Sequence, residues 1–476
     1  MRTKRNATTG NEMMTDRSTG TANVLLGGAP RVSDTRRRIA TTTPRHLAAA
    51  VLTLAALGCA SAQTPAPATA DDLVARARGI HERVITLDTH VDINPGNFRV
   101  GQPNYKDRLN TQVNVAKMEE GGLDAAFLIV YVGQNPSFTS EAYARAYNQA
   151  IEKFDAIHRL VDSIAPDRVA LARTADDVRR ISAQGKKAIL IGVENGYPIG
   201  DDITRVKTFY DRGARYLSMA HNGHSQLSDS NTGERDGKWQ WNGVSPLGEQ
   251  VIGELNRWGI MVDISHPSKQ SMMRTLQLSK APIIASHSGV RAICNHSRNL
   301  DDEQLKALAK NGGVAQLVAF DAYVKERAPD SPARTQAIAA LRAEFGLTGG
   351  GLGAGAIQQL PADKRSDFQR RLAELNRQFP PPPRATVADF VNHIDYAVKL
   401  IGIDHVGISS DFDGGGGVEG WSDATETFNV TLELVRRGYT EAQIGKLWSG
   451  NLLRVLTDVQ RVARELQQTS AVGATR

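Results

Sequence analysis

The sequence predicts an α/β fold, a (β/α)8 barrel of the TIM type with an insertion between its seventh and eighth strands. Eight short apolar runs rich in Ile and Val, a composition typical of buried parallel strands, alternate with segments of helical periodicity. Histidine or acidic residues directly follow several of these runs. Parallel barrel strands present such residues together at one rim, so both observations favour the same fold.

Residues 1–62 are expected to be an export signal. They hold nine Lys/Arg and three Asp/Glu, and an Arg-rich stretch precedes the apolar segment LAAAVLTLAALGCASA. That segment is shorter than the roughly 20 residues of a membrane span, and it ends in small residues as secretory signals do. We therefore predict an exported protein. Two forms stay open: a periplasmic one cleaved after Ala62, and a lipoprotein anchored to a bacterial membrane through Cys59.

The rest of the chain is electrically neutral. The whole chain has 57 Lys/Arg and 51 Asp/Glu, so 48 of each remain after the leader. A neutral body provides no electrostatic basis for binding nucleic acid. The chain has two cysteines, Cys59 and Cys294. Once Cys59 is cleaved off or lipidated, Cys294 has no disulfide partner and is expected to be a buried packing residue.

After the leader, we expect a tether over 63–80, the barrel over 81–460 and a polar tail over 461–476. The strands are expected near residues 84–91, 123–132, 187–194, 214–221, 259–265, 282–287, 313–320 and 405–411. Helices are expected at residues 141–164, 201–213, 246–257, 268–279, 302–311, 387–401 and 440–457. Glycine is common just after these helices, which fits C-terminal capping.

The insertion, residues 322–386, interrupts this alternation. It contains the Gly-rich run TGGGLGAGA, which we interpret as a flexible linker, and a charged helical stretch at 362–378. It follows the carboxyl end of the seventh strand, where barrel enzymes carry active-site loops. Its role as a lid, an oligomer contact or decoration is left open.

His90 and Asp92 end the first apolar run, VITLDTHVD. Residues i and i+2 of a strand point to the same face, so both side chains can reach one metal ion at the barrel rim. The structural alternative is a core histidine beside a capping aspartate. The residues at the later strand ends favour the metal site.

Glu194 follows the run AILIGV. A carboxylate at the end of a buried strand is costly unless it is paired or bound to metal, and one Glu can give an oxygen to each of two metals. His266 and His287 end the runs GIMVDISH and APIIASHS and are expected to hold the second ion. This ligand set favours zinc and also permits manganese or iron.

Three further residues are candidates for the reaction itself. Asp411, after the last strand, is expected to act as general base and then as general acid toward a leaving amine. His221 is expected to donate to the oxyanion at a scissile carbonyl, with His224 as a nearby alternative. The fork of Arg298 suits a substrate carboxylate, and a structural salt bridge is its alternative role. Asp413 is expected to be a turn residue.

With these residues identified, the chain resembles the membrane dipeptidase family, also called renal dipeptidases. The resemblance spans residues 84–456, and its motifs follow the order of the family. They are DTHVD (88–92), GVENG (192–196), MAHN (219–222), VDISH (262–266), ASHS (285–288) with SRN (297–299), SDFDG (410–414) and NLLRV (451–455).

The resemblance implies a (β/α)8 fold with two Zn²⁺ per chain and hydrolysis of dipeptides, including those with a D-residue at the carboxyl end, by a metal-bound hydroxide. Some members also open β-lactam rings. It implies that Glu194 binds both ions, and that His221 and Arg298 contact substrate while Asp411 handles protons. The first zinc would be completed by His90 and Asp92, the second by His266 and His287.

Two departures and two alternatives remain. Tyr197 stands near the place where many members have a histidine that supports the metal ligands. The insertion replaces a short link, which leaves the substrate range and a homodimer open. A binuclear amidohydrolase acting on another amide, lactone or phosphoester is one alternative, although such enzymes usually carry a bridging Lys where this chain has Glu194. A non-catalytic exported binding protein is the other, but no ligand candidate nor Asp411 has been lost.

Overall fold

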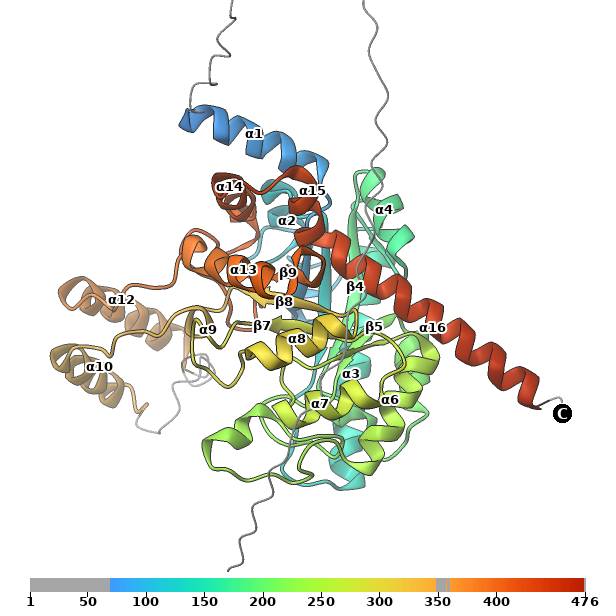
Figure 1. Ribbon diagram of the computed structural model, residues 1–476. Coiled ribbons are helices and arrows are strands. Elements are labelled where there is room, and N and C mark those ends of the chain that lie inside the picture. Colours follow the sequence, from blue (N-terminus) through green and yellow to red (C-terminus); the bar gives the residue numbers. More distant parts are fainter. Residues whose placement is uncertain (1–68, 348–356, 358–359, 475–476) are drawn as a thin grey trace, which may run out of the picture. The chain divides into compact units, whose positions relative to one another are not determined.

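The computed structural model describes residues 69–347, 357 and 360–474 (Figure 1). These residues belong to one compact unit that begins at Ala66. The expected export signal, including Cys59 and Ala62, and the Gly-rich run at 348–356 lie outside the described residues.

The centre of the unit is a nearly closed barrel of eight parallel strands. Its sheet runs in the order β1-β2-β4-β5-β6-β7-β8-β9, and β3 pairs with β4 beside this path. The backbone N–H of Asp92 donates to the carbonyl of Phe412 at 2.9 Å and brings the two ends of the sheet together. The strands are β1 (Leu87–Asp92), β2 (Ala125–Tyr131), β3 (Val169–Leu171), β4 (Lys187–Glu194), β5 (Ala214–Ser218), β6 (Met261–Asp263), β7 (Ile284–Ser288), β8 (Val314–Val318) and β9 (Val406–Ser409).

All eight predicted barrel strands are therefore present. Their apolar residues are almost entirely buried because helices cover the outer face and side chains fill the interior. β2 and β4 pair in continuous register from Ala125↔Ala188 to Tyr131↔Glu194. This register brings Glu194 to the carboxyl rim of the barrel.

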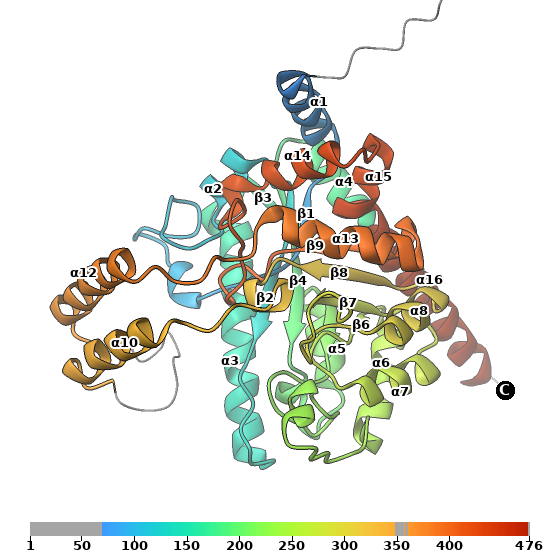
Figure 2. The same cartoon turned by 60° about the vertical axis from the view of Figure 1, so that its left-hand side comes forward.

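Helices surround the strands in both views (Figures 1 and 2). Most begin at a Ser, Thr, Asp or Asn whose side chain accepts a backbone N–H, as Thr139 and Ser245 do. The main helices are α1 (Ala70–Arg83), α2 (Val115–Gly121), α3 (Ser140–Arg159), α4 (Ala175–Ala183), α5 (Arg205–Asp211), α6 (Pro246–Trp258), α7 (Lys269–Leu278), α8 (Asp302–Lys310), α13 (Val387–Ile401), α14 (Phe428–Arg436), α15 (Glu441–Gly445) and α16 (Asn451–Ala474).

The ends of the chain differ from the prediction. The expected tether over 63–80 stops earlier, because residues 70–80 belong to α1, which a capping box of Thr69 and Asp72 begins. Ala77 and Ile80 are buried where α1 packs on α14. The expected polar tail over 461–476 is also helical as far as Ala474, because α16 continues through it.

The insertion lies between β8 and β9, as predicted. It contains α9 (Asp321–Val324), α10 (Pro332–Glu344) and α12 (Ala362–Gln378), of which the helix at 362–378 was expected and α10 was not. α10 and α12 lie side by side, with Arg334, Leu341 and Phe368 buried (Figure 2). Their remaining surface is mostly polar, as the sequence of α12 indicates.

Two further findings concern the helices and the buried cysteine. None of the helices that the structure describes is both long and apolar enough to cross a bilayer. Cys294 is buried, and its thiol lies 3.6 Å from the carbonyl of Ala322. It is therefore a packing residue, as expected.

Candidate metal centre

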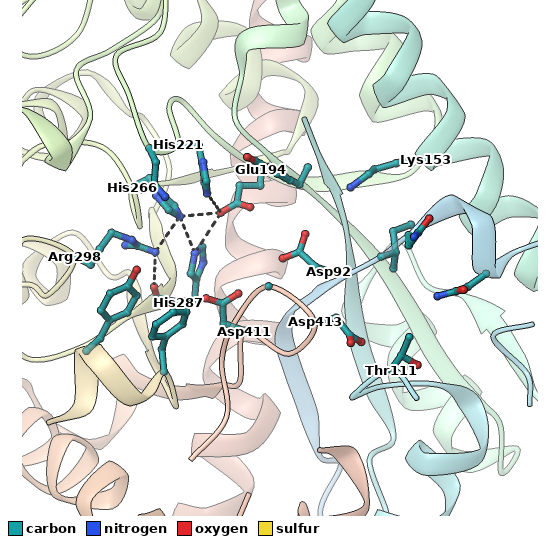
Figure 3. Close-up of a pocket in the computed structure, with 18 of the residues that line it drawn as sticks. Asp92, Thr111, Lys153, Glu194, His221, His266, His287, Arg298, Asp411 and Asp413 are labelled. Atoms are coloured by element: carbon teal, nitrogen blue, oxygen red, sulfur yellow. Dashed lines mark hydrogen bonds and ion pairs between the residues drawn. The ribbon is translucent and has the colours of Figure 1, made fainter. Parts of the chain in front are cut away.

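A cavity of about 600 Å³ opens where the barrel strands end (Figure 3). Seven of the eight predicted site residues line it, and the eighth, His90, is fully buried beside it. They come from β1, from the ends of β4 and β7, and from the segments that follow β5, β6, β7 and β9. The structure thus brings all eight together, namely His90, Asp92, Glu194, His221, His266, His287, Arg298 and Asp411.

The two carboxylate oxygens of Glu194 face different histidines. Oε2 lies 3.5 Å from Nε2 of His90, whereas Oε1 lies 2.9 Å from Nε2 of His266 and 3.3 Å from Nε2 of His287. Oδ2 of Asp92 lies 3.6 Å from Nε2 of His90. A carboxylate in this position can give one oxygen to each of two metal ions.

Hydrogen bonds fix the orientation of His90. Its Nδ1 lies 2.8 Å from the hydroxyl oxygen of Tyr216, and that hydroxyl donates its own hydrogen to the carbonyl of Thr89 at 3.0 Å. Nδ1 must therefore carry a hydrogen, which leaves Nε2 as the nitrogen that is available to a metal ion. This arrangement is the one that a metal-binding histidine requires.

His287 is held in the same way by different residues. The Ser286 hydroxyl donates to Oδ2 of Asp263 at 2.6 Å, so Nδ1 of His287 is the donor in its 2.8 Å contact with the Ser286 oxygen. Asp263 is fully buried and also accepts the backbone N–H of Ser265 and of Ser286. The lone pair of His287 Nε2 is left facing Glu194.

These residues fit a pair of metal ions. Nε2 of His90 and Oε1 of Glu194 are buried and form no hydrogen bond with any residue that the structure describes. Buried polar atoms of this kind are rare unless an ion or water satisfies them. Ligand atoms within 4.8 Å of one another form three overlapping groups, which are His90–Glu194–His287, Glu194–His221–His266 and His90–Asp92–Asp411.

The charges of the cluster affect its histidines differently. Burial acts to lower the pKa of His90, but Glu194 and Asp92 outweigh it and raise that pKa well above its ordinary value. Burial and the charge of Arg298 hold the pKa values of His266 and His287 well below their ordinary value. The last two imidazoles are therefore neutral, which is the form that binds metal.

Asp411 has a strained backbone and an unusual pKa. Its φ of 59° lies in the left-handed region that non-glycine residues seldom adopt, and such strain gathers at functional sites. Burial, together with Asp92 and Glu194, raises its pKa to about 8. A Cβ on Gly414 would lie 2.3 Å from Oδ1 of Asp411, so this turn requires glycine to leave the carboxylate in place.

His221, rather than His224, faces the cavity. Nε2 of His221 lies 4.0 Å from Oε1 of Glu194, and its ring packs on those of Tyr131 and His266. His224 contacts Oδ1 of Asp229 at 3.0 Å through Nδ1 and the carbonyl of Lys238 at 3.0 Å through Nε2. These contacts hold His224 within the loop that follows β5, and it does not line the cavity.

Arg298 is a buried cation with unused donors. Its Nη2 donates to Nε2 of His266 at 3.0 Å and to the carbonyl of His287 at 3.2 Å. Nε and Nη1 are buried and have no hydrogen-bond partner among the described residues. No carboxylate in the described part of the chain forms a salt bridge with it, so the structural salt bridge is not observed. Its guanidinium lies 5.4 Å from the ring centre of Tyr323.

Other residues at the cavity were not predicted. Tyr323 begins the insertion in α9, and Lys153 comes from α3, so neither follows a barrel strand. Asp413, expected to be a turn residue, has a φ of 62° and accepts the backbone N–H groups of Gln112 and Val113, although it also lines the cavity. Tyr197 donates to the carbonyl of Ser137 at 2.6 Å and does not line the cavity.

Comparison with known proteins gives a consistent assignment. The sequence model of the membrane dipeptidases, peptidase family M19, matches residues 74–470. The dipeptidase aclJ of Aspergillus oryzae is 28% identical over 368 residues, which are 76% of this chain and 74% of that protein. The dipeptidase tcpJ of Claviceps purpurea is 28% identical over 356 residues, or 74% of this chain and 70% of that protein.

Solved structures agree with the sequence comparisons. The probable dipeptidase PvdM from Pseudomonas aeruginosa is 34% identical, with a TM-score of 0.68 over 83% of this chain and 100% of that one. A metallopeptidase from Rhodobacter sphaeroides, solved with a phosphinate mimic of L-Ala-D-Ala, is 21% identical. Its TM-score is 0.59 over 79% of this chain and 99% of that one, a likeness of fold.

Proposed function

The chain belongs to the membrane dipeptidase family, peptidase family M19, and on this premise we propose that it is an exported dipeptidase with two zinc ions that accepts dipeptides with a D-residue at the carboxyl end. As a member of this family it is a metal-dependent hydrolase. The observation that carries the proposal of two ions is Glu194, whose two oxygens face separate histidines.

We assign the ligands from these contacts. His90, Asp92 and one oxygen of Glu194 would hold the first ion, and the other oxygen of Glu194 with His266 and His287 would hold the second. Tyr216 and Ser286 support this assignment because they accept the Nδ1 hydrogens of His90 and His287, so that Nε2 is the nitrogen that each ring offers to a metal. Zinc bound there would supply an activated water and polarise the peptide carbonyl.

Arg298 and His221 would orient the dipeptide. The free Nε and Nη1 donors of Arg298 can take the carboxyl-terminal carboxylate, which a dipeptide carries one residue away from its scissile bond. His221 lies across the cluster from Asp411 and would donate to the oxygen of the scissile carbonyl. Together they would hold the peptide bond near Glu194.

Asp411 would move the proton. The attacking water loses a proton and the leaving amine gains one, so one group near both can do both tasks. Burial and the neighbouring carboxylates keep the pKa of Asp411 high enough for it to hold a proton near neutral pH. That repulsion is weaker when Asp92 and Glu194 hold cations, which brings the pKa down toward the range of a general base.

The experiment that tests the function combines metal analysis with a substrate panel. Purified protein, reconstituted with zinc and freed of excess ion, is expected to contain about two zinc ions per chain. It is expected to hydrolyse both L-Ala-L-Ala and L-Ala-D-Ala. Protein with one ion or none would contradict the proposed metal centre. Zinc-loaded protein that hydrolyses no dipeptide of the panel would contradict the proposed dipeptidase function.

Export is proposed from the leader sequence. Mass spectrometry of the protein from its native host is expected to find either Gln63 as the first residue or a lipid-modified Cys59. An unprocessed chain beginning upstream of residue 59 would contradict export by either route. The oligomeric state is a separate question, which sedimentation of the same material answers.

A further inference from the structure

Lys153 places a positive charge in the cavity on the side away from Arg298. It projects from α3, whereas the candidate metal ligands belong to barrel strands or to the segments that follow them. In Figure 3 Lys153 and Arg298 lie on opposite sides of Glu194, and Asp92 lies between Lys153 and the histidines. The ammonium lies 5.4 Å from the ring centre of Tyr131, which also lines the cavity.

This ammonium has no close counter-charge in the part of the chain that the structure describes. Lys117 and Lys187 are also shielded from solvent, but their ammonium groups lie 2.7 Å from Asp423 and 3.1 Å from Asp124. Among the described residues, no carboxylate lies within 4.0 Å of Lys153 Nζ, and it makes no hydrogen bond. Burial accordingly lowers its pKa, although Asp92 and Glu194 oppose the change. A half-buried cation of this kind is costly unless something else satisfies it.

The chemistry of a dipeptide limits what can satisfy Lys153. The carboxyl-terminal carboxylate is assigned to Arg298, and the scissile bond to the cluster around Glu194. The part of the substrate beyond the cluster is then its amino-terminal residue. The α-amino group of that residue is a cation and would be repelled by Lys153, so a side-chain carboxylate is the group that fits.

We propose that Lys153 binds the side-chain carboxylate of the amino-terminal residue, so that this enzyme prefers dipeptides whose first residue is Glu or Asp. This inference rests on the proposed dipeptidase function and on the assignment of Arg298 to the other end of the substrate. The cavity of about 600 Å³ has room for a long first side chain, since pockets of about 300–1,000 Å³ hold ligands larger than a dipeptide. The flexible stem of Lys can reach the carboxylate of the shorter Asp side chain or of the longer Glu side chain.

The test compares L-Glu-L-Ala with L-Gln-L-Ala, which have the same shape and differ in one charge. The wild type is expected to have a higher kcat/KM for L-Glu-L-Ala. In Lys153→Met the ratio of the two kcat/KM values is expected to fall about tenfold, mostly through KM, the loss typical of one charge-assisted hydrogen bond. Lys153→Arg is expected to retain most of the preference, and Lys153→Glu to favour L-Lys-L-Ala.

Arg145→Met is the matched control, because Arg145 is an exposed cation on the same helix and does not line the cavity. It is expected to keep the wild-type ratio, which separates a direct contact from a change in net charge. Thermal melting and zinc content identify any variant that has lost its fold or its metals.

Three outcomes would overturn the inference. If the wild type has the same kcat/KM for L-Gln-L-Ala and L-Glu-L-Ala, the assignment of Lys153 is wrong, but the dipeptidase function is not contradicted. If Lys153→Met lowers kcat/KM by the same factor for both peptides, Lys153 supports the metal centre and does not bind the substrate side chain. A zinc-loaded wild type that hydrolyses neither peptide contradicts the proposed function and this inference with it.

Discussion

Tyr216 determines which nitrogen of His90 faces Glu194. Its hydroxyl oxygen lies 2.8 Å from Nδ1 of His90, and its hydrogen is already donated to a backbone carbonyl. The Tyr216 ring is fully buried against Gly192 of β4, where a Cβ would lie 2.2 Å from its Cζ. The tyrosine therefore depends on a glycine in the next strand for its place.

Tyr216→Phe removes this hydroxyl and keeps the ring. We expect zinc affinity to fall about 10- to 100-fold, because His90 loses the partner that fixes its tautomer and orientation. Titration against a chelator of known affinity measures the change. Tyr147→Phe, on the outer helix α3, is the control and is expected to bind zinc like the wild type. Unchanged affinity in Tyr216→Phe would show that the hydroxyl does not support the ligand.

Asp411→Asn separates proton transfer from metal binding. Asparagine tolerates the left-handed backbone of residue 411 and has the same shape, but it cannot carry a proton. We expect kcat to fall about 10²- to 10⁴-fold while two zinc ions stay bound. Steady-state kinetics and metal analysis of the same preparation test both parts.

The second measurement is decisive because Asp411 lies in one candidate ligand group with His90 and Asp92. If zinc is lost along with activity, Asp411 is a ligand and our division of roles is wrong. If both zinc and activity remain near the wild-type level, another group transfers the proton.

The sequence predicted the barrel because its strands are continuous apolar runs that burial on both faces requires. β3 was not predicted because it is three residues long and half-buried, so the sequence shows no apolar run there. α1 and α4 were missed although each begins with a capping box, Thr69–Asp72 and Thr174–Asp177. That short signal could have located both helices.

The strand-end residues of the candidate site were predictable for the same reason. His90, Glu194 and His287 each follow or end an apolar run, and a parallel barrel brings such ends together. Lys153 and Tyr323 lie on a helix and in the insertion, so their presence at the cavity depends on packing that local sequence does not encode. The alternation of β5 would have placed Tyr216 on one face of the strand, but not against His90.

Arg298→Ala tests recognition of the free carboxyl end. We expect KM for a dipeptide to rise about 10- to 100-fold, as is typical when a hydrogen bond to a charged group is lost. The zinc content is expected to stay at two. The control is the same dipeptide with an amidated carboxyl end, which gives Arg298 no carboxylate to bind. If the variant loses the same factor for both peptides, Arg298 has a structural role.

His393 predicts a pH dependence of stability away from the metal centre. It lies on α13, where its Nδ1 accepts the backbone N–H of Val290 at 3.0 Å and its Nε2 donates to the carbonyl of Val324 at 2.8 Å. It thus joins the loop that carries Arg298 to the start of the insertion. Burial lowers its pKa, and the acceptor role of Nδ1 also requires the neutral ring.

Because the folded state resists protonation of His393 more than the unfolded state does, protons favour unfolding. The contribution of His393 is therefore complete above the unfolded pKa of about 6.5 and is lost as the pH falls through the lowered folded value. His393→Gln cannot titrate, so its free energy of unfolding should fall less than that of the wild type between about pH 7.5 and 5. Urea unfolding of both proteins measures this difference, in which the other titrating groups cancel. Equal losses in the two proteins would mean that His393 is not the group whose protonation weakens this junction.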